Sequence, residues 1–292
     1  MMHAAWCAWR AASPGGSGKG SSDKEQEDLA YHVSACAGGR RGKGGKPMRR
    51  IDNVWRGIEA GVSRSRRGLI ILEEEGERVY RPRGLIAAAK RTACGLAKAG
   101  VGPGDRVGIM AQTTPATVIT FLGCWAAGAV AVPLPLPMRA VDPASFIEQS
   151  RGRLERVGAR LITLPGSLMP MVGELGMGVR MVACEELSSG GGLPPAPTVP
   201  EDIALVQFTS GSTSEPRGVV LTHANIMANA RAIARKAKVT HRDCVVSWMP
   251  LYHDMGLIGF LITALSYGTT LVLMSPQRFV SDPGLWMRAL SE

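Results

Sequence analysis

The sequence predicts an α/β protein with doubly wound, mostly parallel sheets that helices cover on both faces. Strand-like apolar runs alternate with helix-like stretches from about residue 69 to the end of the 292-residue chain. The predicted strands are apolar throughout rather than at every second residue, which is typical of parallel strands buried on both faces. With 45% hydrophobic and 20% charged residues, the chain can bury a sizeable core.

The first predicted elements are a hairpin and two helices. "LIIL" and "ERVY" bracket the turn 73–76 as a β-hairpin, and the Ala-rich residues 83–99 form a helix that Gly100 ends. "RVGIM" is a short buried strand. Thr114 and Pro115 then supply the N-cap and first position of a helix that runs to Ala127, and "AVAVP" is the next strand.

The same alternation continues to the end of the chain. Asp142 and Pro143 begin a helix to about Val157, followed by strand "RLITL", a short helix over 165–175 and strand "VRMVAC". The Ser/Gly/Pro-rich residues 188–202 are either an interdomain linker or a long surface loop. After strand 203–208 come a helix with an apolar stripe from Ile226 to Ala237, strand "CVVSW", helix 257–267, strand "TLVLM" and a last helix capped at 282–283.

Residues 1–47 are predicted to be a disordered basic arm, because they mix Gly, Ser, Lys and Arg with few large apolar side chains. About half of the formal net charge of +10 lies in the first fifty residues. No aromatic residues interleave with these charges, which disfavours a nucleic-acid arm. Ordered structure is predicted from Met48, which is also a candidate initiator.

The remaining composition favours a cytoplasmic protein with neither a metal cluster nor a disulfide. The six cysteines are scattered singly, without C-x-x-C or a histidine at metal-ligand spacing, and most lie in apolar runs. Residues 107–138 and 255–277 are charge-free and long enough to span a bilayer, but prolines and glycines interrupt them. The chain start lacks the basic and apolar regions of a signal peptide. We therefore expect no transmembrane segment.

The stretch "FTSGSTSEPRG", residues 208–218, is the strongest candidate for a ligand site. A strand that leads into a Gly/Ser/Thr loop presents backbone N–H groups and hydroxyls to an anion, and glycine permits close approach. The loop is not a Walker A motif, because it has no Lys followed by a hydroxyl residue. Alone, such a loop is also compatible with an ordinary surface turn.

Two ordered motifs resemble a known family. "FTSGSTSEPRGVVLTHAN" resembles the phosphate-loop signature of the adenylate-forming superfamily. "VVSWMPLYHDMGLIGFLITALSYGTTLVLMSP" resembles its next core motif, in the form that is typical of fatty acyl-AMP ligases and long-chain acyl-CoA synthetases. "GVGPGDRVGIM" and "CWAAGAVAVPL" also fit, so the resemblance covers about residues 54–292. It implies that residues 48–292 are part of the amino-terminal domain of the adenylate-forming fold.

The resemblance implies that an acid attacks the α-phosphate of ATP to give acyl-AMP and pyrophosphate, after which the acyl group passes to a carrier-protein or CoA thiol. ATP is then the cosubstrate, and the ligands of Mg²⁺ are expected outside this chain. The implied phosphate-binding residues are Thr209, Ser210, Gly211, Ser212, Thr213, Ser214, Arg217 and Gly218. Two of them depart from the usual motif, since Ser214 replaces a glycine and Arg217 replaces a lysine.

The second motif implies an acid-binding turn. His253 is the candidate catalytic residue, because the family places a His or another residue there beside the reacting carboxylate. Peptide-synthetase adenylation domains have an aspartate in this register, so a fatty or related acid is favoured over an amino acid. The implied substrate-binding residues are Tyr252, His253, Gly256, Leu257 and Phe260.

Two alternatives remain open: an amino-acid-activating adenylation domain, and a catalytically incomplete phosphate- or nucleotide-binding module. The family's adenine, ribose and catalytic-lysine elements are expected beyond Glu292. We therefore expect the chain by itself not to complete adenylation.

Overall fold

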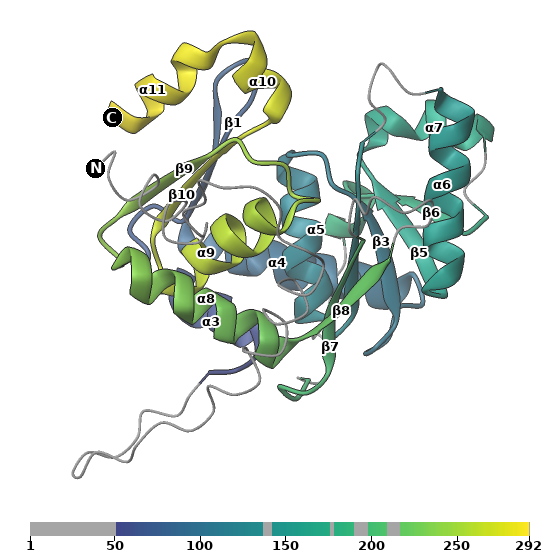
Figure 1. The fold of residues 1–292 in the computed structure, drawn as a ribbon, viewed down its shortest axis with the longest axis horizontal. Coiled ribbons are helices and arrows are strands. Elements are labelled where there is room, and N and C mark those ends of the chain that lie inside the picture. The colour runs from purple at the N-terminus through teal and green to yellow at the C-terminus, as the bar shows by residue number, and fades with distance from the viewer. Residues whose placement is uncertain (1–50, 137–141, 176–177, 190–197, 209–216, 292) are drawn as a thin grey trace, which may run out of the picture.

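The computed structural model describes residues 51–136, 142–175, 178–189, 198–208 and 217–291. The predicted disorder of the arm 1–47 therefore concerns residues outside the described ones. Within the described part the α/β prediction is confirmed, because two mostly parallel sheets alternate with layers of helices (Figure 1).

The smaller sheet has four strands in the order β2-β1-β10-β9. They are β1 (Leu69–Leu72), β2 (Glu77–Tyr80), β9 (Cys244–Ser247) and β10 (Thr270–Met274). β10 pairs in parallel with both β1 and β9, whereas β2 is antiparallel to β1. Strands from the two ends of the described chain thus meet in one sheet.

The larger sheet has six strands in the order β6-β5-β3-β4-β7-β8. They are β3 (Arg106–Met110), β4 (Val130–Leu134), β5 (Ala159–Leu164), β6 (Arg180–Ala183), β7 (Ile203–Phe208) and β8 (Gly218–Thr222). All neighbours pair in parallel except β8, which is antiparallel to β7 at the edge.

A central layer of helices lies between the two sheets (Figure 1). Its members are α3 (Val54–Val62), α4 (Pro82–Lys98), α5 (Pro115–Ala126), α8 (His223–Ala237), η3 (Met255–Ile262) and α9 (Thr263–Tyr267). One apolar cluster joins this layer to the inner faces of both sheets, for example through Ile71 and Val107. Within it, the fully buried indole of Trp125 donates from Nε1 to the Ala204 carbonyl at 3.0 Å. The central helices are therefore the main core of the molecule.

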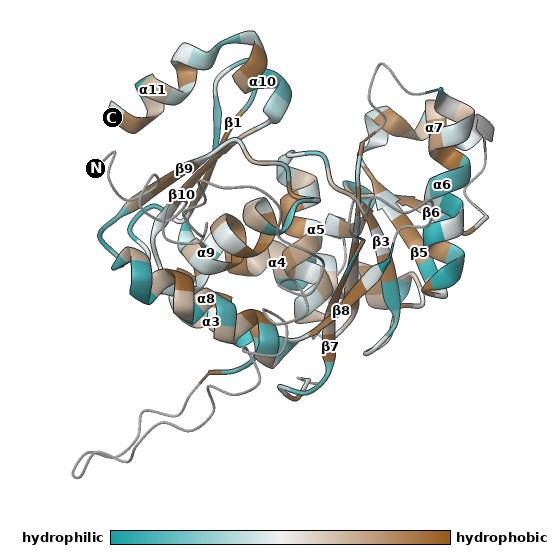
Figure 2. Ribbon diagram, in the orientation of Figure 1, coloured by the Kyte–Doolittle hydropathy of each residue, from teal (hydrophilic) through white to brown (hydrophobic). Residues whose placement is uncertain are grey.

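Shorter helices cover the outer faces. On the larger sheet lie α6 (Pro143–Arg156), η1 (Gly166–Leu168) and α7 (Met169–Leu175), and η2 (Glu186–Ser189) packs on α4. The outer face of the smaller sheet packs against α10 (Pro276–Ser281) and α11 (Pro283–Ser291). Figure 2 shows apolar colour along the buried strands and mixed colour along α6 and α11, as expected for helices with one face in solvent.

Local signals in the sequence explain several of these boundaries. The 73–76 hairpin turn is confirmed, with the Glu73 N–H donating to the Gly76 carbonyl at 3.0 Å. Thr114 and Asp142 cap α5 and α6 through their side chains, as predicted. Among the cysteines of the described residues, Cys94, Cys124 and Cys184 are buried, whereas Cys244 is exposed.

Several elements differ from the prediction, which also lacked the helix α3. Residues 218–222 form the edge strand β8 before α8 begins, so the chain pairs with β7 rather than passing directly into a helix. The helix expected over 257–267 begins as the π-helix η3, in which Thr263 Oγ1 donates to the Ile258 carbonyl at 2.7 Å. Ser275 caps the short helix α10, which the sequence pattern did not single out. None of the helices in the described ranges is long and apolar enough to cross a membrane.

Candidate functional site

The first motif lies at the carboxyl edge of the larger sheet. β7 ends at Phe208, which pairs with Gly218 at the start of β8. Residues 209–216, which include the predicted contacts from Thr209 to Ser214, lie outside the described residues. Arg217 and Gly218 are described, and both are exposed. The carboxyl edge of parallel strands is the usual ligand-binding edge of an open α/β sheet.

The second motif follows β9 at the carboxyl edge of the smaller sheet. The His253 N–H donates to the Pro250 carbonyl at 3.1 Å, and the Leu257 N–H donates to the His253 carbonyl at 2.9 Å. These two bonds fold residues 250–257 into a turn that leads into η3. We refer to residues 250–257 as the acid turn, after the role that the family resemblance implies for them.

A glycine closes the acid turn. A Cβ atom on Gly256 would lie 2.1 Å from the Pro250 carbonyl oxygen, so the two backbone segments approach as closely as only glycine permits. Leu257 is fully buried in the main core, and Phe260 is half-buried on η3. The packing of Leu257 in the main core therefore holds the turn in place. The π-helix that follows is a rare conformation that is found frequently at functional sites.

His253 presents its imidazole on the outside of this turn. Its side chain is 53% exposed, and Nδ1 lies 2.7 Å from Asp254 Oδ1. The Met255 N–H lies 3.2 Å from His253 Nδ1 but only 2.6 Å from Asp254 Oδ1. When Nδ1 carries a proton it donates to Asp254, and Nε2 then remains available to a ligand. Asp254 thus orients the imidazole.

A buried amide connects the two motifs. Gln207, next to the last residue of β7, is 9% exposed, and its Nε2 donates to the Tyr252 carbonyl at 2.8 Å. Tyr252 also packs against the main core. Strand β7, which leads to residues 209–216, is therefore hydrogen-bonded to the acid turn. Sequence reasoning missed Gln207, because nothing in a strand pattern shows which distant carbonyl a polar side chain meets.

A second buried polar group fixes the chain after β8. His223, the first residue of α8, is fully buried, and its Nδ1 accepts from the Val54 N–H at 3.2 Å. Its Nε2 lies 3.0 Å from Thr198 Oγ1, which also accepts from Asn53 Nδ2 at 2.8 Å. Burial lowers the pKa of His223 to about 4, although the Asp202 carboxylate acts in the opposite direction. The imidazole is therefore neutral near pH 7 and serves as an anchor between α3 and α8.

Metal-binding chemistry is not provided by the described residues. The described ranges contain no group of three or more His, Cys, Asp or Glu side chains that could hold a metal ion. Of the predicted site residues that are described, the structure brings Tyr252, His253 and Gly256 onto one turn. Arg217 and Gly218 lie on the neighbouring strand pair.

The comparisons with known proteins agree with this architecture. The AMP-binding enzyme family matches residues 83–292, so the chain belongs to that family. It is 34% identical over 208 residues to the protein described as putative ligase Rv1013 of Mycobacterium tuberculosis, covering 70% of this chain and 38% of that protein. It is 32% identical over 228 residues to the long-chain-fatty-acid–AMP ligase FadD26 of Mycobacterium bovis, covering 72% of this chain and 36% of that protein.

A solved structure shows the same fold. A structure from a study of fatty acyl-adenylate ligases of E. coli and L. pneumophila matches with a TM-score of 0.74 and 30% sequence identity. The match covers 81% of this chain and 44% of that chain. The chain thus spans little more than a third of the length of these two curated relatives.

Proposed function

We propose that this chain is part of an ATP-dependent acid ligase that activates a fatty or related carboxylic acid as acyl-AMP. The acyl group would then pass to the thiol of a carrier protein or of CoA. The observation that carries the proposal is the Gln207–Tyr252 hydrogen bond, which holds the strand before the phosphate loop against the acid turn. Two groups that must react together need such a fixed relation.

The described residues fit the two ends of this reaction. Arg217 is an exposed cation beside the loop and would hold phosphate oxygens through charge-assisted hydrogen bonds. His253, as the imidazolium, would donate from Nδ1 to Asp254 and from Nε2 to the carboxylate of the acid. When bound, Mg²⁺ would neutralise phosphate charge.

The identity of the acid follows from the same turn. An amino acid substrate would need an anionic partner for its ammonium group. Here the turn carries His253, and the neighbouring Asp254 is already paired with it at 2.7 Å. We therefore favour a plain carboxylic acid whose chain lies along the apolar residues of η3. A phosphate- or nucleotide-binding module without catalysis is the second candidate.

The test is acid-dependent ATP–pyrophosphate exchange by the longest gene product that contains this chain. A panel of fatty acids, arylalkanoic acids and amino acids separates the substrate classes. We expect exchange with the first two classes, and we expect His253→Ala to lower it by raising the KM for the acid. The matched control is His241→Ala, another exposed histidine, which should leave exchange unchanged. Nucleotide binding without exchange for any acid would favour the non-catalytic module.

A further inference from the structure

Exposed cations gather at the amino-terminal edge of the smaller sheet. They are Arg64, Arg66 and Arg67 before β1, and Lys238 and Arg242 between the end of α8 and the start of β9. Within the described part of the chain, Arg67 alone of this group forms an ion pair, with Glu77 at 4.0 Å. We refer to these cations as the basic edge.

Strand pairing brings the segments of the basic edge together. The Gly68 carbonyl, just before β1, accepts from the Leu271 N–H at 3.0 Å. The Asp243 carbonyl, just before β9, accepts from the N–H of the first β10 residue at 3.1 Å. Both loops therefore flank the start of β10. Burial raises the pKa of the Cys244 thiol, and the Arg67 guanidinium acts in the opposite direction, so Arg67 lies close to the start of β9.

The backbone at Lys238 has a conformation that favours glycine. Its φ is 54°, and it is the one residue other than glycine with a positive φ in the described ranges. A cation thus ends α8 where glycine would be the less strained choice. Arg235 and Lys236, in the last turn of α8, interact favourably with the helix dipole, so we do not count them in the basic edge.

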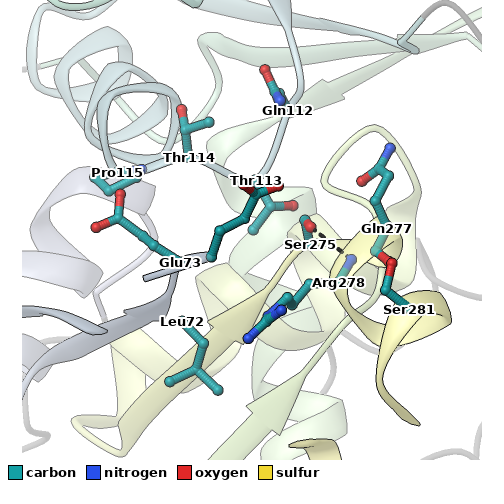
Figure 3. A pocket seen from close by; sticks show the side chains of 11 residues that line it. Leu72, Glu73, Gln112, Thr113, Thr114, Pro115, Ser275, Gln277, Arg278 and Ser281 are labelled. Atoms are coloured by element: carbon teal, nitrogen blue, oxygen red, sulfur yellow. Dashed lines mark hydrogen bonds between the residues drawn. The ribbon is translucent and has the colours of Figure 1, made fainter. Parts of the chain in front are cut away.

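The opposite edge of the same sheet has a different character. Figure 3 shows a cavity of about 440 Å³ where β1 and β10 end, lined by Leu72, by Ser275 and by the carboxylate-bearing Glu73. The acid turn follows β9 at this carboxyl edge. A molecule that binds an anionic surface through its basic edge therefore keeps the acid turn on the side away from that surface.

The chemistry of the basic edge restricts the partner. None of the exposed large apolar side chains in the described ranges belongs to residues 63–68 or 238–243. Protein interfaces depend on apolar and aromatic anchors, and single-stranded nucleic acids stack on aromatic side chains. A lipid surface with anionic headgroups needs neither, because it attracts Lys and Arg by charge alone.

We propose that the basic edge binds the anionic surface of a lipid bilayer. The choice of lipid rests on the proposed function, because every CH₂ group of a fatty acid favours the bilayer over water. Binding brings the enzyme to the phase in which its acid substrate is concentrated. The carboxyl edge of the smaller sheet, with the acid turn, stays open to ATP and to the thiol acceptor.

The test is sedimentation of the purified chain with lipid vesicles. Vesicles of equal parts phosphatidylglycerol and phosphatidylcholine should bind the chain, and pure phosphatidylcholine should not. High salt should release the chain, because it screens exposed charges. Neither ATP nor an acid is present, so the result is independent of whether the chain supports exchange. Absence of binding to the anionic vesicles would overturn the proposal.

A triple variant locates the binding. It combines Arg64→Gln, Arg66→Gln and Arg242→Gln, all at exposed positions, so the melting temperature should not change. Binding to anionic vesicles should weaken about a hundredfold, since each cation near such a surface contributes about fivefold. Vesicle binding that survives in this variant, while its affinity for duplex DNA or polyglutamate falls, would show that lipid is the wrong partner.

The matched control removes the same number of charges elsewhere. It replaces by glutamine the exposed Lys98, Arg106 and Arg160, which lie near the starts of β3 and β5 in the larger sheet. Vesicle binding should weaken less than about threefold in this control. Equal losses in the two triple variants would mean that overall charge, rather than the basic edge, determines binding, and would contradict the proposal.

Discussion

The acid turn and strand β8 are held in place in different ways. Hydrogen bonds, a tight glycine contact and the fully buried Leu257 fix the acid turn. By contrast, Arg217 next to β8 is exposed, and the β8 residues Val219 and Val220 are 42% and 54% exposed. The comparison teaches that substitutions at packed positions of the acid turn, such as Gly256, should affect folding first, whereas substitution of the exposed Arg217 should affect the exchange reaction more than stability.

The largest loss of stability is expected for Gly256→Ala. The added methyl group would lie 2.1 Å from the backbone oxygen of Pro250, so the turn must move. We expect a loss of about 3 kcal/mol in the free energy of unfolding, the upper end of the usual cost of overpacking, measured by urea denaturation. The matched control is Gly259→Ala on the same helix, where the nearest atom is Met255 Cγ at 3.5 Å. Similar stabilities of the two variants would show that the acid turn is not rigid.

The buried His223 at the start of α8 should make the free energy of unfolding depend on pH. The pKa of His223 is about 4 in the folded protein and 6.5 ordinarily, so between these values the unfolded chain binds a proton that the folded chain does not. Its contribution is therefore complete above about pH 6.5 and decreases as the pH falls toward 4, by at most about 3 kcal/mol. Urea unfolding at several pH values measures the change. His223→Gln should flatten the profile, and an unchanged slope in that variant would assign the effect to other groups.

A smaller loss is expected for Gln207→Leu, which removes the donor to the Tyr252 carbonyl. The buried carbonyl then lacks this partner, which costs about 1 to 2 kcal/mol. In the active gene product kcat for exchange should fall more than the affinity for ATP, because the acid turn loses its fixed position. Gln149→Leu on the exposed face of α6 is the control. If exchange kinetics stay normal while stability falls, Gln207 is structural only.

The smallest effect on stability, below about 0.5 kcal/mol, is expected for Arg217→Ala, because the side chain is exposed. Exchange should nevertheless slow about ten- to a hundredfold, since a charge-assisted contact is worth about 1.5 to 3 kcal/mol. Arg217→Lys should recover part of the rate, and the exposed Arg242→Ala should have no effect. Exchange at the original rate in Arg217→Ala would mean that this residue does not contact phosphate.

Local chemistry explains which parts of the fold were predictable. The Thr114 and Asp142 caps and the 73–76 turn depend on adjacent residues, and all were predicted. Strand β8 was missed because Val219 and Val220 are exposed and precede a helical pattern directly. The π-helix was missed because an uninterrupted apolar run contains no information about which hydrogen-bond spacing the backbone adopts.

The candidate site also contains some residues that the sequence predicted and others that it did not. His253 and Arg217 were found because their motifs carry a recognisable order of residues. Gln207 and His223 were not found, because each depends on contacts between segments far apart in the chain. The predicted phosphate contacts from Thr209 to Ser214 stay predictions, since those residues lie outside the described part.

The pairing of β1 with β10 has a consequence for synthesis on the ribosome. Leu69 pairs with Leu271, so the first hairpin leaves the ribosome about two hundred residues before its parallel partner. At translation rates of about 5 to 20 residues per second, this delay is roughly 10 to 40 s. During that time the apolar side chains of β1 lack the neighbouring strand that shields them. The smaller sheet therefore cannot be completed until β10 has been synthesised.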